Sequence, residues 1–317
     1  MLDPNNALLS QARSGKRLTP IWLVIPLAIV IPILSQMGAI PLVVLNLIRH
    51  TPDLVALASK DINALAELAL PQTPLEQTLF LISSFGGTYI LIWLWLRLVE
   101  GRPLTSVGLQ KKKAFFKFGR GFGVGTTLFV AVVILGSLPG SYSLEINPVF
   151  RGGSMVGVVV VLLGWLIQGS AEELLFRGWV LPVVGARYRL WLGIIISSLM
   201  FALAHVFNPN IGLTAILNLL LFGLFTALYA LWEESLWGVF SIHAVWNWLQ
   251  GNIFGLEVSG LALPGESLFI TQEGGLDVLT GGAFGPEGGL LATFVLGLSI
   301  GLLFWLNRRD RSKSFVV

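Results

Sequence analysis

Residues 212–232 read GLTAILNLLLFGLFTALYALW and contain no Asp, Glu, Lys, Arg or His. About 20 apolar residues in a helix cross a hydrocarbon core about 30 Å thick, so this stretch is long enough to span a membrane. Seven further stretches meet the same criterion, at 21–48, 78–99, 119–137, 154–182, 189–206, 235–253 and 289–306. The sequence therefore predicts an all-α membrane protein of about eight transmembrane helices, forming one bundle around an intramembrane polar cavity.

The composition supports extensive contact with lipid. Hydrophobic residues make up 55% of the 317-residue chain and charged residues 12%, whereas about 25% of the residues of ordinary globular domains are charged. Cysteine is absent, which excludes disulfides and Cys-ligated zinc or iron–sulfur sites. No basic run alternates with aromatic residues, so we expect the lipid bilayer as surroundings and no nucleic acid as a partner.

The placement of charge predicts the orientation, because short connections rich in Lys and Arg stay in the cytoplasm. Every second connection or terminus is basic, and these carry Arg13, Lys16, Arg17, Arg97, Arg102, Lys111, Lys112, Lys113, Lys117, Arg120, Arg187, Arg189, Arg308, Arg309, Arg311 and Lys313. The opposite connections are more acidic. Segment 49–77 has Asp53, Asp61, Glu67 and Glu76 against Arg49 and Lys60, and segment 254–288 has Glu257, Glu266, Glu273, Asp277 and Glu287 with no Lys or Arg. We therefore expect a multi-pass protein of the plasma (inner) membrane with both termini in the cytoplasm, and an irregular extracytoplasmic loop at 254–288.

Polar side chains inside the spans are the candidates for chemistry, since a charge at a helix centre costs at least about 2.5–3.5 kcal/mol. Glu173 and Arg177 are four residues apart and are predicted to form an ion pair on one helix face. Glu172 lies about 100° round the helix from Glu173 and is left without that partner. Gln168, one turn earlier, is placed to hydrogen-bond to Glu172.

Three polar residues on other spans complete the set, namely His205 on one span and His243 and Asn247 on another. His243 and Asn247 are four residues apart and share a helix face. Counted along their helices, the depths of Glu172, His205 and His243 differ by about 12 Å at most, which tilt can absorb. The four residues can therefore surround one cavity near the middle of the membrane.

These residues resemble the motifs of the CAAX protease and bacteriocin-processing family (CPBP, or Abi). Residues 172–177 are similar to its EExxxR motif, Phe201–His205 to its FxxxH motif and His243–Asn247 to its HxxxN motif. The resemblance covers roughly 155–250 and implies an intramembrane endopeptidase like the type II CAAX prenyl endopeptidases. Such an enzyme hydrolyses peptide bonds of membrane-associated or prenylated protein substrates with a glutamate-activated water. We expect the cavity of this chain to open toward the cytoplasm.

The resemblance also implies a role for each matching residue. Glu172 would be the general base that activates water, and His205 would bind and polarise that water. His243 and Asn247 would stabilise the oxyanion. The supporting residues would be Glu173, Arg177 and Phe201.

Four parts are expected along the chain. They are a cytoplasmic N-terminal tail at 1–20, three spans within 21–153, a CPBP-like catalytic core of four spans at 154–253, and a last part at 254–317. The last part comprises the extracytoplasmic loop, the eighth span and a basic cytoplasmic tail. Pro32 and Pro41 predict a kink, or a short helix outside the membrane, in the first span.

Three alternatives remain open. No cofactor is favoured, but Glu172, His205 and His243 would suffice to bind zinc as a divalent metal, although no HExxH motif is present. The same cavity could serve a non-catalytic scaffold, or an immunity or maturation factor of the same family. A proton-coupled transporter also uses Glu and His inside the membrane, but it is less favoured because no repeat or pair of broken helices is evident.

Overall fold

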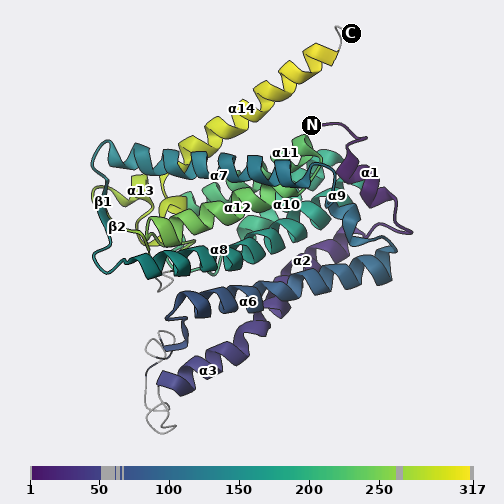
Figure 1. Cartoon of the computed structure of the whole chain (residues 1–317). Helices are drawn as coiled ribbons and strands as arrows, with labels where there is room; N and C mark the ends of the chain where they lie inside the picture. Colours follow the sequence, from purple (N-terminus) through teal and green to yellow (C-terminus); the bar gives the residue numbers. More distant parts are fainter. Residues whose placement is uncertain (1, 51–60, 62–64, 66–67, 262–266, 315–317) are drawn as a thin grey trace.

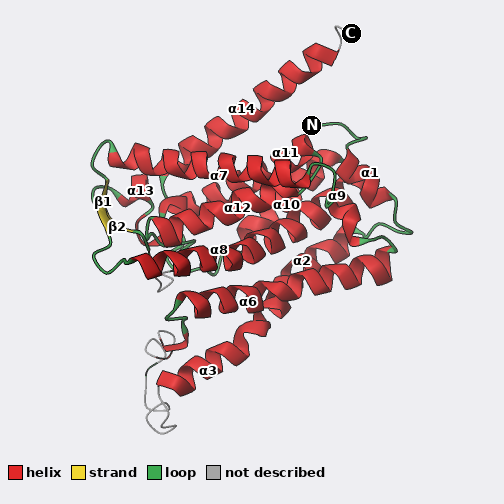
Figure 2. Ribbon diagram, viewed as in Figure 1, coloured by secondary structure: helices red, strands yellow, loops and turns green. Residues whose placement is uncertain are grey.

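The structure, a computed structural model, describes residues 2–50, 61, 65, 68–261 and 267–314. Most of these residues are helical, as Figure 2 shows. Four residues used in the charge pattern lie outside the described ones, namely Asp53, Lys60, Glu67 and Glu266.

Figure 1 shows the course of the chain through its helices and strands. The α-helices are α1 (Ala7–Arg13), α2 (Ile21–Gln36), α3 (Ile40–His50), α6 (Pro74–Trp95), α7 (Ala114–Ser137), α8 (Gly152–Glu173), α9 (Leu181–Arg187), α10 (Leu190–Leu203), α11 (Leu213–Glu233), α12 (Trp237–Trp248), α13 (Asp277–Thr280) and α14 (Leu290–Ser314). The π-helical segments are η2 (Leu96–Glu100), η4 (Leu174–Val180) and η5 (Leu249–Ile253). The short 3-10 helices are η1 (Met37–Ala39), η3 (Leu104–Val107), η6 (Gly282–Phe284) and η7 (Pro286–Gly288), and the strands are β1 (Tyr142–Ile146) and β2 (Phe269–Glu273).

Six helical stretches of the described chain are long and apolar enough to cross a membrane. They are Ile21–His50, Pro74–Glu100, Ala114–Ser137, Ser154–Arg187, Leu213–Glu233 and Leu290–Arg308. The expected spans at 189–206 and 235–253 correspond to α10 and to α12 with η5, and neither is among the six. Helix α10 has 14 residues, which rise about 21 Å, less than the hydrocarbon thickness. The prediction of a helical membrane bundle is confirmed, but the count of eight spans is not.

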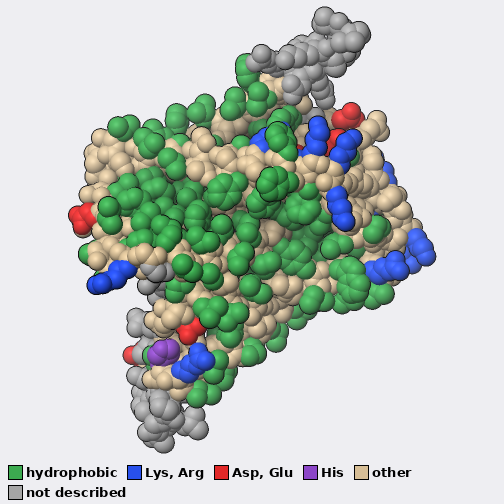
Figure 3. Space-filling view, in the orientation of Figure 1, with side chains coloured by type: hydrophobic (Ala, Val, Ile, Leu, Met, Phe, Trp, Pro, Cys, Tyr) green, Lys and Arg blue, Asp and Glu red, His purple; other side chains and the backbone are tan. Residues whose placement is uncertain are grey.

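The helices pack side by side, with α12 between α7 and α8 and with α6 on the other side of α8 (Figure 1). Helix α10 packs against α11, which also contacts α14, and α2 packs against α6. Hydrophobic side chains cover the middle of the face shown in Figure 3, and Lys and Arg gather mainly at its right-hand end. Exposed apolar side chains on three different helices include Ile90, Leu163 and Phe294, which are 59%, 57% and 61% exposed. Such a broad apolar surface is expected where a protein meets lipid.

The first predicted span changes to a 3-10 turn between Pro32 and Pro41. Helix α2 ends at Gln36, the 3-10 turn η1 follows, and α3 continues from Ile40. Pro26 and Pro32 lie inside α2, where each removes a backbone N–H donor.

The N-terminal residues pack against the helices. Helix α1 contacts α9, and Leu8, Leu9 and Ala12 are completely buried. The segment predicted as a tail thus covers the end of the bundle where the basic connections lie.

Residues 254–288 differ from the irregular loop that was expected. Strand β2 in this segment pairs antiparallel with β1, from Tyr142 opposite Glu273 to Ile146 opposite Phe269. The Tyr142 hydroxyl donates to the Thr280 carbonyl oxygen at 2.7 Å. Burial raises the pKa of Tyr142 above its ordinary value, so the hydroxyl stays protonated and remains a donor. Pairing between segments so far apart in the chain has no local sequence signal, which is why the strands were not predicted.

Candidate active site

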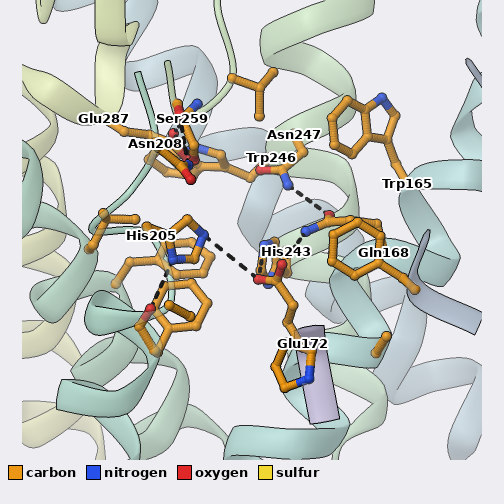
Figure 4. Close-up of a pocket in the computed structure, with 18 of the residues that line it drawn as sticks. Trp165, Gln168, Glu172, His205, Asn208, His243, Trp246, Asn247, Ser259 and Glu287 are labelled. Carbon is orange, nitrogen blue, oxygen red and sulfur yellow. Dashed lines mark hydrogen bonds and ion pairs between the residues drawn. The ribbon is translucent and has the colours of Figure 1, made fainter. Parts of the chain in front are cut away.

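Glu172, His205, His243 and Asn247 line one cavity of about 250 Å³ (Figure 4). Glu172 comes from the last turn of α8, His205 from the turn after α10, and His243 and Asn247 from α12. The structure therefore brings together all four residues singled out as candidates for chemistry. The differences in depth that were counted along the helices therefore do not prevent Glu172, His205 and His243 from lining the same cavity.

The two carboxylate oxygens of Glu172 have different surroundings. Oε1 accepts a hydrogen bond from Gln168 Nε2 at 2.8 Å, as the spacing of these residues predicted. Oε2 is buried and has no hydrogen-bond partner among the described residues. It lies 4.0 Å from His205 Nε2 and 3.8 Å from His243 Nε2. These distances are too long for direct hydrogen bonds, and a water molecule is the usual bridge at such a spacing.

The protonation pattern of both histidines follows from what their Nδ1 atoms contact. His205 Nδ1 lies 2.8 Å from the Phe201 carbonyl oxygen, and His243 Nδ1 lies 3.0 Å from Glu173 Oε1. Carbonyl and carboxylate oxygens only accept, so each Nδ1 carries the proton. In the neutral form, the Nε2 atoms near Glu172 therefore present lone pairs.

Glu173 and Arg177 form the predicted ion pair, and both side chains are fully buried. Arg177 Nε lies 3.2 Å from Glu173 Oε2. The Arg177 guanidinium also lies 4.5 Å from the centre of the Phe201 ring, a cation–π contact. The sequence did not predict that Glu173 also accepts the His243 hydrogen bond. Glu173, which was predicted to be a supporting residue, thus contacts a candidate catalytic side chain directly.

Asn247 is connected to Glu172 through the side chain of Gln168. Asn247 Nδ2 donates to Gln168 Oε1 at 2.9 Å, so a chain of hydrogen bonds runs from Asn247 through Gln168 to Glu172. An amide nitrogen carries two N–H bonds, and this contact uses one of them. The role of Asn247 in stabilising an oxyanion stays a prediction.

Sequence reasoning missed a second polar group at the edge of the cavity. Figure 4 shows Asn208, Ser259 and Glu287 together on the far side of His205 from Glu172. These residues lie in connections, where polar side chains are common, so hydropathy could not single them out.

A metal ion bound in this cavity would have Glu172, His205 and His243 as its candidate ligands. Within the described part of the chain, no group of three or more His, Cys, Asp or Glu side chains is arranged to hold one. Glu172, His205 and His243 would have to rearrange to become the ligands of a zinc ion.

The amino-acid sequence of residues 154–249 matches the protein-family model described as type II CAAX prenyl endopeptidase Rce1-like. These residues are an Rce1-like domain. The resemblance drawn from three short motifs is thereby confirmed. The Rce1-like domain holds all seven predicted catalytic and supporting residues, whereas Ser259 and Glu287 lie outside it.

Two relatives give the extent of the similarity. The chain is 29% identical over 164 residues to YyaK, an uncharacterized protein of Bacillus subtilis (strain 168), and the match covers 49% of this chain and 54% of YyaK. It is 34% identical over 112 residues to an uncharacterized 24.3 kDa protein of Escherichia coli, covering 33% of this chain and 49% of that protein. The chain thus spans about half the length of these relatives. No solved structure matches it.

Proposed function

We propose that this protein is an intramembrane endopeptidase that hydrolyses a peptide bond of a membrane-associated protein substrate. The observation that carries the proposal is Glu172 Oε2, which is buried, lacks a hydrogen-bond partner among the described residues and lies near both His205 Nε2 and His243 Nε2. A carboxylate oxygen left free among imidazoles is suited to hold and deprotonate a water molecule. The Rce1-like domain adds support, since that family is named for an endopeptidase.

The proposed reaction uses water as the nucleophile. Glu172 Oε2 removes a proton from a water molecule that also donates to His205 Nε2, and the water oxygen attacks the carbonyl carbon of the substrate. Glu172 then delivers that proton to the nitrogen of the breaking C–N bond. The products are a carboxylic acid and an amine, and Glu172 returns to its starting state.

Attack by water leaves a negative charge on the carbonyl oxygen of the substrate, and hydrogen-bond donors must stabilise that charge. The second N–H of the Asn247 amide is one donor. His243 becomes another when its Nε2 is also protonated, because both nitrogens of a histidine cation donate. Glu173, hydrogen-bonded to His243 Nδ1, stabilises that cation. Zinc bound by Glu172, His205 and His243 is the alternative, and elemental analysis of the purified protein distinguishes the two.

A comparison of membrane proteomes tests the proposal and identifies the substrate. Strains that carry the wild-type gene, the Glu172→Gln variant or no gene are compared by mass spectrometry of new peptide ends. Ends that occur only with the wild type are expected, because the amide of Gln cannot act as a base. Glu145→Gln, a change at an exposed residue of β1, is the matched control and should keep those ends. A Glu172→Gln profile equal to that of the wild type would favour a non-catalytic scaffold.

A further inference from the structure

The polar group of Asn208, Ser259 and Glu287 lines the same cavity as the catalytic candidates, yet the proposed reaction does not use it. Ser259 donates to Glu287 Oε2 through its backbone N–H at 2.8 Å and through its hydroxyl at 2.7 Å. Asn208 Nδ2 donates to the Ser259 carbonyl oxygen at 2.9 Å. Among the described residues, no hydrogen bond or ion pair uses Glu287 Oε1 or Asn208 Oδ1. Both donors of Ser259 are thus occupied, whereas two acceptor oxygens are left for an occupant of the cavity.

The backbone that carries Glu287 is held by Asn218 of α11. Asn218 Nδ2 donates to the carbonyl oxygens of Glu287 at 2.9 Å and of Gly289 at 2.8 Å. Its Oδ1 accepts from the Thr293 hydroxyl at 2.7 Å. Together with the two hydrogen bonds from Ser259, these contacts fix the Glu287 carboxylate in place before a ligand binds. A site that is already ordered loses little conformational freedom on binding.

The charge lining this cavity is negative. The described lining residues include the two carboxylates Glu172 and Glu287 and contain no Lys or Arg. None of the ion pairs within the described part of the chain includes Glu287. Many of the other lining side chains are apolar, such as Leu219, Phe222 and Leu261, and charges interact more strongly in such surroundings than in water. The cavity therefore favours a cation near Glu287.

The position of Glu287 relative to the reacting groups determines which part of an occupant it can meet. Figure 4 shows Glu287 on the far side of His205 from Glu172. In the proposed reaction, the attacked carbonyl group lies beside the water between Glu172 and His205. Both carboxylates line one cavity of about 250 Å³, so a substrate whose carbonyl group is placed at Glu172 extends toward Glu287 with a neighbouring residue.

We propose that Glu287 determines substrate specificity by binding a Lys or Arg side chain close to the cleaved peptide bond. An ammonium or guanidinium group carries several N–H donors and no acceptor, and it matches Glu287 Oε1 and Asn208 Oδ1. The substrate class is then a membrane-associated polypeptide with a basic residue beside its cleavage site. The identity of the occupant as a substrate rests on the proposed peptidase function; the preference of the cavity for a cation does not.

The preference for a cation can be measured on the purified protein without any substrate, because the natural chain has no cysteine. Leu261→Cys introduces one thiol in the lining, two residues from Ser259, at a position where Leu261 is 44% exposed. The thiol is allowed to react with a methanethiosulfonate that carries a trimethylammonium group or with one that carries a sulfonate group. The ratio of the two rates is measured with Glu287, with Glu287→Gln and with the matched control Glu145→Gln. Because both reagents react with the same thiol, its own reactivity cancels in the ratio.

Glu287→Gln should lower the ratio of cationic to anionic labelling by at least about 5-fold, the effect of one unit charge at a few ångströms. The Gln side chain keeps an oxygen that can accept both hydrogen bonds from Ser259, so the turn at 258–261 should persist. Glu145→Gln, on the exposed face of β1, should leave the ratio unchanged. A ratio that is the same with Glu287 and with Glu287→Gln would overturn the proposal.

A strain with Glu287→Gln, added to the comparison of membrane proteomes, tests the proposed specificity. The new peptide ends made by the wild type should have Lys or Arg within a few residues of the cleaved bond, and Glu287→Gln should reduce these ends about 10-fold or more. An equal loss at sites with and without a nearby basic residue would show that Glu287 serves structure alone and would overturn the proposal. The labelling requires no cleavage, so a failure of this proposal can be told from a failure of the proposed peptidase function.

Discussion

Glu173 is the residue whose environment adds most to the sequence-based interpretation. The spacing of four residues predicted its ion pair with Arg177, because that contact lies within one helix. Its hydrogen bond to His243 joins residues 70 positions apart, and nothing in either local pattern indicates it. Glu173 thus both neutralises a buried cation and orients a candidate catalytic ring.

Removing Glu173 alone should be more harmful than removing it together with Arg177. Glu173→Leu leaves Arg177 buried and uncompensated, which we expect to cost about 3–5 kcal/mol of stability. The double variant with Arg177→Met should regain most of that stability, because no charge is left unpaired. Thermal unfolding in detergent measures both.

Cleavage by the double variant separates a positioning role of Glu173 from a purely structural one. With no partner on Nδ1, the His243 ring is no longer held, and a loss of about 100-fold in kcat is expected from its misplacement. Full recovery of both stability and cleavage in the double variant would show that Glu173 serves stability alone.

Helix α12 carries two of the candidate residues and is held closely between α7 and α8. A Cβ on Gly125 of α7 would lie 2.5 Å from Val245 Cγ1 and 2.8 Å from the Ile242 carbonyl oxygen. A Cβ on Gly169 of α8 would lie 2.9 Å from the Ala244 backbone nitrogen. Glycine at these positions lets both neighbours approach the α12 backbone, and this fixes His243 relative to Glu172.

Gly125→Ala should therefore destabilise the protein by about 1–3 kcal/mol, as overpacking does. Gly123→Ala on the same helix is the matched control, because a Cβ there would meet no atom of another described helix within 4 Å. The control should be neutral or more stable by about 0.5–1 kcal/mol, since alanine favours a helix. Equal shifts in the unfolding temperature of the two variants would contradict this account of how α12 is placed.

At the level of elements, hydropathy predicted most of the helices but not their ends. The expected span at 189–206 is the short helix α10, since the chain turns at residues 204–212, which include Pro209. The π-helical segment η4, which follows Glu173 directly, leaves no signal in hydropathy. The strands β1 and β2 were missed because their pairing is non-local.

For the whole molecule, the sequence led to two expectations about the sides of the membrane. Charge placement put both termini in the cytoplasm, and the cavity was expected to open there as well. The cavity is lined by residues of α2, α6, α8, α11, α12 and α14, together with Asn208 and Ser259, and the side on which it opens stays a prediction. The position of a cavity depends on how helices pack together, which the sequence of separate spans does not reveal. The choice of candidate residues needed no such knowledge, because a polar side chain is costly in any apolar helix.

The central claim is that Glu172 activates water for peptide hydrolysis, and cleavage by the purified, reconstituted protein tests it most directly. Wild type, Glu172→Gln and Glu145→Gln are placed in liposomes with the substrate identified from the proteome comparison, in the presence of a chelator. The wild type and Glu145→Gln should cleave at similar rates, and Glu172→Gln should be slower by about 10²–10⁴-fold, the usual contribution of a general base. Cleavage by Glu172→Gln at the wild-type rate would contradict the account.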